Sequence, residues 1–176
     1  AATVPIRLNR QEASAGATKF ANLERVIGGQ GNDTLIGDHV STRWQITGPN
    51  QGIVLSEVDG QTLEFIGFEN LTGGSATDTF EFAAGATLDG TIDGGSDSGG
   101  NEEANDQRDH VDFSAYVTPL MVDLGGGTAT PATGGIANVE HVTGGSAGDT
   151  LRGNDDANQL IGNHGDDTIE GLGGND

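Results

Sequence analysis

The stretch Gly144–Asp176, GGSAGDTLRGNDDANQLIGNHGDDTIEGLGGND, decides the fold of this chain. It divides into units of nine residues that open at Gly144, Gly153, Gly162 and Gly171. In every unit position six is Asp or Asn, and in each complete unit position eight is apolar. A short period with glycine, acidic and apolar residues at fixed places predicts a stack of similar turns and short strands.

Related units occur upstream. Gly28–Ile36 reads GGQGNDTLI, and Gly73–Glu81 reads GGSATDTFE. A longer segment around the first unit, ANLERVIGGQGNDTL, matches Ala137–Leu151 at a constant offset of 116 residues. The stretch Phe68–Phe80 matches the same segment at an offset of 45. Three copies in one short chain indicate that a single structural unit is repeated.

These units resemble the RTX nonapeptide, GGxGxDxUx with U apolar, a calcium-binding β-helix repeat. The resemblance is strict over Gly28–Ile36, good over Gly144–Asp176, and looser over Gly73–Glu81, where Ala76 replaces a glycine. It implies an all-β fold, a right-handed parallel β-roll or β-solenoid with two nonapeptides per coil and calcium ions between stacked Gly/Asp turns. It also implies a module of a large secreted bacterial surface or adhesin-like protein.

The residue types suit such a turn. Glycine tolerates positive φ and lets carbonyl groups approach an ion, and calcium takes six to eight oxygen ligands at about 2.3–2.6 Å. In a coil of two nonapeptides, facing turns are 18 residues apart. Asp149 then faces Asp167, and Asn158 faces Asp176. We expect one site on each edge of the C-terminal roll, the Asn158 site being the weaker because it has one charge less.

The upstream turns are assigned by the same pattern. Asp33 is expected to form a site with its neighbouring coil near Asp78. We interpret residues 96–107 as an inserted acidic loop, after which Asp109 takes position six and Val111 position eight. Asp93 and Asp155 are additional candidates. The predicted calcium ligands are Gly28, Gly29, Gly31, Asp33, Gly73, Gly74, Asp78, Asp93, Asp109, Gly144, Gly145, Asp149, Gly153, Asp155, Asn158, Gly162, Gly165, Asp167, Gly171, Gly173 and Asp176.

The chain organisation follows from these repeats. Residues 1–43 are predicted to form a first solenoid repeat, 44–116 wider central coils, and 117–176 a second repeat ending in the nonapeptide roll, together one continuous solenoid. Alternating polarity predicts strands in Thr62–Leu71 and His110–Val117. All strands are expected to stack in parallel. The predicted core is narrow and includes Leu35, Phe80, Leu151, Leu160 and Ile169.

Composition excludes several functions. The chain has 7 Lys and Arg against 27 Asp and Glu, a net charge of −20, which argues against nucleic acid and anionic membranes as partners. Only 33% of residues are hydrophobic, 31 are glycine and none is cysteine, so a large helical core, a disulfide framework and membrane insertion are not expected. HExxH does not occur, and we expect no enzyme activity.

The expected function follows from charge. Crowded carboxylates repel one another, and a thin core offsets little of the backbone ordering cost of about 1–2 kcal/mol per residue, so calcium binding should drive folding. We expect an extracellular or cell-surface calcium-binding structural module that stacks with neighbouring domains or copies, its export by a type I system being implied by the resemblance. The alternative is an adhesin module that binds a glycan or protein. Trp44 and Tyr116 are of the type that stacks on sugars, but for lone aromatics we expect packing in the core or at a coil end instead. The chain starts without Met and stops in mid-nonapeptide, so we expect a piece of a longer protein.

Overall fold

The computed structural model describes residues 6–7, 24–96 and 108–176, and these residues form strands and turns with no helix. Consequently no helix in this part of the chain is of the kind that crosses a membrane. The predicted all-β class is therefore confirmed. The insertion at 96–107 lies outside the described residues except for Ser96.

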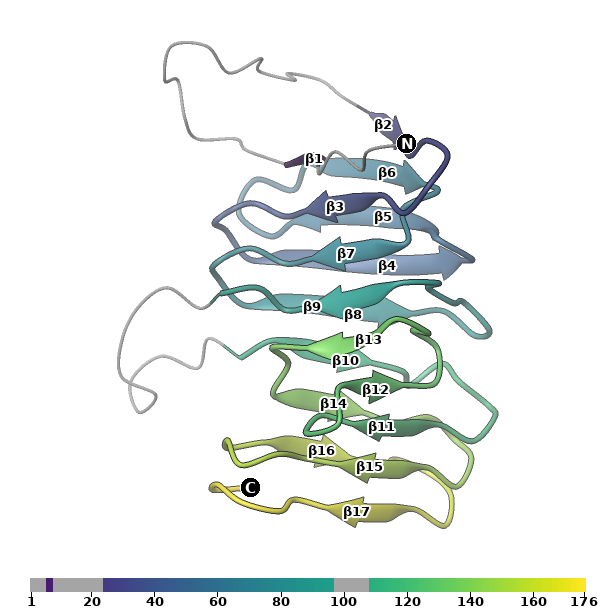
Figure 1. The fold of residues 1–176 in the computed structure, drawn as a ribbon, viewed down its shortest axis with the longest axis vertical. Helices are drawn as coiled ribbons and strands as arrows, with labels where there is room; N and C mark the ends of the chain where they lie inside the picture. The colour runs from purple at the N-terminus through teal and green to yellow at the C-terminus, as the bar shows by residue number, and fades with distance from the viewer. Residues whose placement is uncertain (1–5, 8–23, 97–107) are drawn as a thin grey trace.

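The strands form three sheets (Figure 1). The five-stranded sheet has the order β1-β3-β7-β9-β13, the eight-stranded sheet β16-β14-β10-β8-β4-β5-β6-β2, and the four-stranded sheet β12-β11-β15-β17. In the five-stranded sheet the bounds are β1 Ile6–Arg7, β3 Thr34–Ile36, β7 Asn70–Thr72, β9 Thr91–Asp93 and β13 Gly135–Ala137. In the eight-stranded sheet they are β2 Arg25–Ile27, β4 Thr42–Gly48, β5 Gln51–Ser56, β6 Thr62–Ile66, β8 Asp78–Phe82, β10 His110–Asp112, β14 His141–Thr143 and β16 Gln159–Ile161. In the four-stranded sheet they are β11 Met121–Asp123, β12 Thr128–Ala129, β15 Thr150–Arg152 and β17 Thr168–Glu170.

The sheets form two layers. In Figure 1 the five- and four-stranded sheets lie one above the other in front of the eight-stranded sheet, and turns at the left and right connect the two layers. The last strands alternate strictly between layers, β14, β15, β16 and then β17, and each pairs in parallel with the strand one coil away. Strands of three residues, each followed by a six-residue turn, reproduce the period of nine in the sequence.

The offset of 116 residues is also a structural repeat. Ile6 of β1 pairs in parallel with Leu35 of β3, and Val122 of β11 pairs in parallel with Leu151 of β15. Both partners are shifted by the same offset between the two pairs. The two copies therefore use the same strand register, as expected when equal sequences form equal coils.

Three predictions about the strands are wrong. The stacking is not parallel throughout, because β5 is antiparallel to both β4 and β6, and β12 is antiparallel to β11. The stretch Thr62–Leu71 is also not one strand. Gly67 has a φ of +71° and turns the chain from β6 into the other layer at β7. In His110–Val117 only β10 is a strand, because the Asp112 carboxylate accepts the Ser114 N–H and starts a turn.

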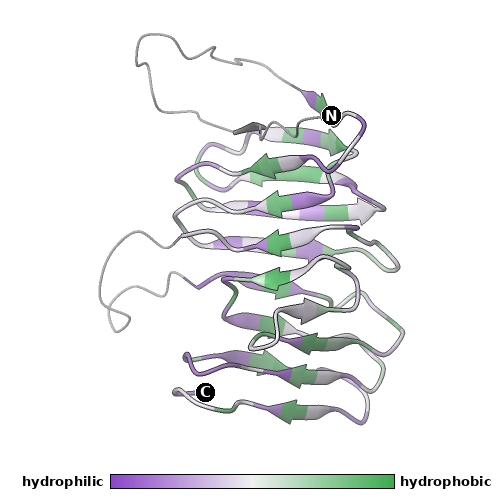
Figure 2. Cartoon of the chain, viewed as in Figure 1, coloured by the Kyte–Doolittle hydropathy of each residue, from purple (hydrophilic) through white to green (hydrophobic). Residues whose placement is uncertain are grey.

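Apolar side chains of both layers meet between the sheets. Figure 2 shows green positions alternating with purple and pale ones along the strands. Leu35, Phe80 and Leu151 are fully buried, as predicted, and Leu160 is partly buried. Ile169 is 46% exposed, contrary to the prediction, because its strand β17 has a neighbour on one side only among the described strands.

The two candidate sugar-binding aromatics are part of this core. Trp44 is fully buried and stacks on Phe80 with ring centroids 5.7 Å apart. Tyr116 is 7% exposed, and its hydroxyl donates to the Ala86 carbonyl. Burial raises the pKa of Tyr116, since the phenolate loses hydration. Buried rings have no face to offer a sugar, so the expectation that both aromatics pack in the core is confirmed.

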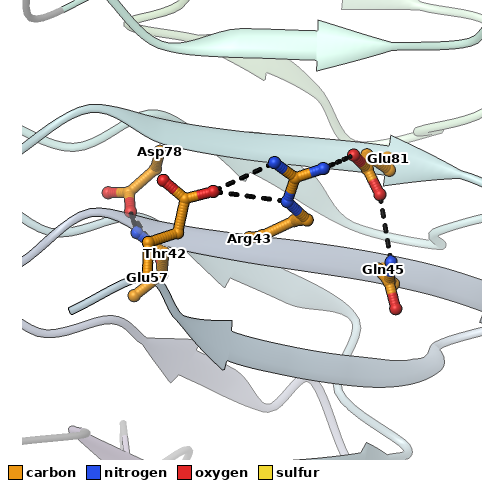
Figure 3. A network of polar contacts seen from close by, with 6 residues as sticks. All are labelled: Thr42, Arg43, Gln45, Glu57, Asp78 and Glu81. Atoms are coloured by element: carbon orange, nitrogen blue, oxygen red, sulfur yellow. Dashed lines mark hydrogen bonds and ion pairs between the residues drawn. The ribbon is translucent and has the colours of Figure 1, made fainter. Parts of the chain in front are cut away.

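The outer face of the eight-stranded sheet carries an ion-pair network (Figure 3). Arg43 of β4 contacts Glu57 at 3.0 Å and Glu81 of β8 at 2.5 Å, and Gln45 also donates to Glu81. The two carboxylates raise the pKa of Arg43. The network joins the antiparallel hairpin to the next parallel strand from the solvent side.

Replacing Arg43 by Met is expected to lower the free energy of unfolding by about 1 kcal/mol or less. The pairs are partly exposed, and exposed ion pairs contribute about 0.2–1 kcal/mol each, while Met keeps the aliphatic contacts of the arginine stem. Urea denaturation in saturating calcium measures the difference. It should shrink further in about 1 M salt because screening removes the attraction. A loss several times larger would show that the network is essential to the sheet.

Candidate metal centre in the stacked turns

The repeated turns gather at two edges of the molecule, seen at the left and right of Figure 1. One set of turns leads into strands of the eight-stranded sheet, and the other leads into strands of the front layer. We define a turn column as the residues that end successive turns at one edge, that is, position six of each turn or its equivalent. The left column is Thr42, Asp78, Asp109, Glu140, Asn158 and Asp176. The right column includes Asp33, Glu69, Leu120, Asp149 and Asp167.

Within a turn, the position-six side chain closes the loop onto its own backbone. The Asp33 carboxylate accepts the Gly29 N–H at 2.6 Å, Asp78 accepts from Gly74 at 2.6 Å, and Asp149 accepts from Gly145 at 2.7 Å. In the same way the Asn158 amide oxygen accepts the Asn154 N–H at 2.8 Å. Each bond spans four residues, which explains why Asp or Asn recurs at a fixed distance from the second residue of the unit.

Between coils, the same side chains accept a second backbone amide. In the right column Asp149 N donates to Asp167 Oδ1 at 2.8 Å, and Leu120 N donates to Asp149 Oδ1 at 2.9 Å. In the left column Asn158 N donates to Asp176 Oδ1 at 2.9 Å. The structure therefore brings together the two predicted pairs that are 18 residues apart. In each case the carboxylate belongs to the coil that comes later in the chain.

The predicted neighbourhood of Asp33 and Asp78 is wrong. Asp33 N donates to Glu69 in the right column, whereas Asp78 lies in the left column between Thr42 and Asp109. The reason is the antiparallel hairpin β4–β5–β6, which lengthens the coil. Both Asp33–Glu69 and Thr42–Asp78 are 36 residues apart, twice the spacing of the C-terminal coils.

The structure places Asp109 where the sequence predicted it. A Cβ on Gly94 would collide with the Asp109 carboxylate, just as a Cβ on Gly73 would lie 2.5 Å from Asp78 Oδ2. Asp109 is 1% exposed, and its Oδ1 accepts the Asp78 N–H at 2.7 Å. The insertion thus leaves position six of the turn in place.

The two additional candidates differ from the others. Asp93 ends β9, where its Oδ1 accepts from Gly95 N and from the Asn138 side chain. Asp155 is exposed, and its Oδ1 would lie 3.0 Å from a Cβ on Gly173. Neither carboxylate is described as accepting a hydrogen bond from the backbone N–H of a turn-column residue. Gly31 and Gly165 have φ of +133° and +124°, a conformation that glycine adopts at no cost.

Three polar column residues were missed by the sequence analysis. Glu69 accepts the Asp33 N–H at 2.8 Å, and Glu140 accepts the Asp109 N–H at 2.9 Å, so Glu replaces Asp in coils without a strict nonapeptide. Thr42 donates its N–H to Asp78 Oδ1. Signals for all three exist in the sequence. The glutamates stand four residues before Gly-Gly in their copies of the repeat, and Thr42 is position six of a unit that opens at Gly37, nine residues after Gly28.

The donor set of these turns suits a hard cation. Carbonyl oxygens converge on the glycines, since a Cβ on Gly144 would lie 3.0 Å from Gly162 O and 2.5 Å from Asp149 Oδ2. A Cβ on Gly148 would lie 2.8 Å from Asp166 O. In the described residues no three His, Asp or Glu side chains are grouped to hold a metal, so a cation in a turn would depend mainly on backbone carbonyls. Carbonyl and carboxylate oxygens are the ligands that calcium prefers.

The hydrogen bonds of the carboxylates leave room for an ion. An ionised carboxylate has about four lone-pair sites, and each oxygen of Asp149 accepts one N–H, from Leu120 or Gly145. Asp149 is 1% exposed, and it takes part in none of the ion pairs found between described residues. A buried carboxylate of this kind is compatible with a calcium ligand that is held in place by two amides.

Gly74→Ala is expected to destabilise the protein, whereas Gly29→Ala at the same position of its own turn is the matched control. A Cβ on Gly74 would overlap the Asp38 carbonyl oxygen of the neighbouring coil, while the nearest atom given for Gly29 is Asp33 Oδ2 at 3.6 Å. We expect a loss of about 1–3 kcal/mol for Gly74→Ala, the usual cost of overpacking. Thermal denaturation in calcium compares the two variants. Equal stability of both would show that the coils are spaced more loosely than described.

Comparison with known sequences identifies these turns. The family of the RTX calcium-binding nonapeptide repeat (4 copies) matches residues 24–39 and 143–176. The two ranges contain the turn of Asp33 and the four consecutive turns that start at Gly144. Searches of curated proteins and of solved structures gave no match. The chain therefore carries RTX calcium-binding nonapeptide repeats in two blocks, with coils of different sequence between them.

Proposed function

We propose that this chain is a calcium-binding structural module of an extracellular or cell-surface protein, built as a right-handed β-roll that becomes rigid when calcium binds and whose strands are parallel except for β5 and β12. The observation that carries the proposal is the pair of turn columns. Their buried carboxylates and converging carbonyls supply oxygen atoms between successive coils, which supports calcium binding there. Bound calcium would supply positive charge that links one turn to the next.

The residues of the chain have distinct parts in this mechanism. The position-six side chains orient the turns by accepting hydrogen bonds from backbone N–H groups. They are Asp33, Asp78, Asp109, Asp149, Asn158 and Asp167. The glycines at positions one and two admit the neighbouring carbonyl oxygens. The Asn158 turn supplies an amide oxygen instead of a carboxylate, so we propose that it is the weaker of the two C-terminal sites.

The charge and burial of the described residues support a structural role. The three arginines whose ion pairs are described, Arg25, Arg43 and Arg152, all contact carboxylates, and Arg152 lies between Asp123 and Glu170. Such pairing and a net charge of −20 do not favour a polyanionic partner. We propose that its partners are neighbouring domains or further copies of the same fold. Secretion by a type I system belongs to the same proposal.

Isothermal titration with calcium, with magnesium as the control ion, tests the proposal. We expect calcium to bind with a dissociation constant on the order of 0.1–1 mM, as in extracellular modules, and magnesium to bind much more weakly because it requires a tight octahedral shell. Absence of calcium binding at millimolar concentration would refute the proposal. A glycan array in the presence of chelator tests the adhesin alternative, since glycan binding without calcium would favour it.

A further inference from the structure

The outer face of the eight-stranded sheet carries two histidines side by side. His110 of β10 and His141 of β14 are direct partners in the parallel register. Between His110 and Asp112, and between His141 and Thr143, stand Val111 and Val142, which are fully buried. Because side chains alternate along a strand, both histidines point to the opposite face, away from the core.

The two rings are close and differently oriented. Their centroids are 6.3 Å apart and their planes meet at 68°, an edge-to-face arrangement. His110 Nε2 lies 2.9 Å from Thr143 Oγ1 on the neighbouring strand. Rotation about the side-chain bonds at this separation brings one nitrogen of each ring toward a common point. Neighbouring strands are about 4.8 Å apart, so the sheet itself fixes the spacing of the pair.

Two carboxylates lie near the pair. Glu81 of β8 and Asp112 of β10 face His110, and Glu81 also binds Arg43. Carboxylates close to a site raise the local concentration of cations.

We propose that His110 and His141 form a two-histidine site for a late first-row transition-metal ion, of the group Cu²⁺, Ni²⁺ and Zn²⁺ that imidazole binds well. The two rings supply two ligands and water completes the shell, consistent with the lack of any three-residue metal cluster among the described residues. The two histidines directly follow the column residues Asp109 and Glu140, but they offer ring nitrogens on the face of the sheet, whereas the turns offer oxygen ligands at its edge. It adds a cross-link between two adjacent coils from the solvent side.

Titration with Cu²⁺ in calcium-saturated protein tests this proposal, followed by calorimetry and by electron paramagnetic resonance. We expect a signal with two nitrogen ligands in the unaltered protein. His110→Gln and His141→Gln should each leave one nitrogen and weaken binding by about tenfold or more.

His164→Gln is the matched control, since His164 is an exposed histidine in the turn before β17. It should leave the affinity and the nitrogen count unchanged. Circular dichroism in calcium checks that every variant is folded, and His141→Gln gives a second test if His110→Gln does not fold. Unchanged Cu²⁺ affinity in a folded His110→Gln or His141→Gln variant would overturn the proposal. So would loss of binding only in His164→Gln.

Discussion

Chelation of calcium is expected to abolish most of the β-sheet circular dichroism of this chain, and added calcium should restore it. Asp149 and Asp167 stand in adjacent turns, where the Asp149 N–H donates a hydrogen bond to the Asp167 carboxylate. Without a cation between them, two carboxylate charges about 5 Å apart repel by about 3 kcal/mol at an effective dielectric constant of 20. When the calcium concentration is one hundred times the dissociation constant of a site, binding at that site adds about 2.7 kcal/mol to the free energy of unfolding. Several such sites equal the whole stability of a typical domain, about 5–15 kcal/mol.

The measurement is far-UV circular dichroism during a calcium titration, with magnesium as the control and a chelator to reverse the change. A cooperative gain of β signal with calcium alone is the expected result. A complete β spectrum in chelator, unchanged by calcium, would contradict it. In that case the hydrogen bonds between backbone amides and side chains in the turn columns would be sufficient to hold the coils together, and calcium would have no part in folding.

Asp149→Ala is expected to be the most damaging single substitution in the C-terminal block. The Asp149 carboxylate is 1% exposed and accepts the N–H groups of Leu120 and Gly145. Alanine leaves both amides without an acceptor, and each buried unsatisfied group costs about 1–3 kcal/mol. We expect a loss of about 2–6 kcal/mol, together with weaker calcium binding.

Urea denaturation in saturating calcium measures this loss. The matched control is Asp166→Ala, which removes an exposed carboxylate with the same charge from the facing turn. Asp149→Asn should lie between the two, because its amide group keeps one acceptor oxygen and places a donor against the other N–H. A stability of Asp149→Ala within about 0.5 kcal/mol of that of Asp166→Ala would show that the carboxylate is not a structural acceptor.

The sequence predicts the geometry within a turn well, because that geometry depends only on residues of the same nonapeptide. The bond from position six to the amide four residues earlier needs only one nonapeptide, so Asp149 and Asn158 are found from spacing alone. The pairing of coils 18 residues apart also follows where the nonapeptides are contiguous. Asp109 is also assigned to position six from the sequence, because the apolar residue Val111 continues the pattern.

The pairing of distant coils is not contained in the period of nine. Nothing in the turn of Asp33 states that its partner is Glu69, because the partner depends on the hairpin that the chain forms in between. The antiparallel β5 is decided by cross-strand packing and by the turn at residues 49–50. The exposure of Ile169 likewise depends on which strands flank β17 rather than on its own unit.

Within the turn columns, the hydrogen bonds from a backbone amide to a side-chain acceptor of another coil all run in one direction. The Leu120 N–H donates to Asp149, the Asp149 N–H to Asp167, and the Asn158 N–H to Asp176, so each acceptor lies in the later coil. The stack is therefore polar, like a filament whose two ends differ. Removing the Asp167 side chain would leave the Asp149 N–H without this acceptor, whereas removing the Asp149 side chain would leave the bond from its own N–H to Asp167 intact. Each of these turns therefore depends on the coil that follows it in the chain.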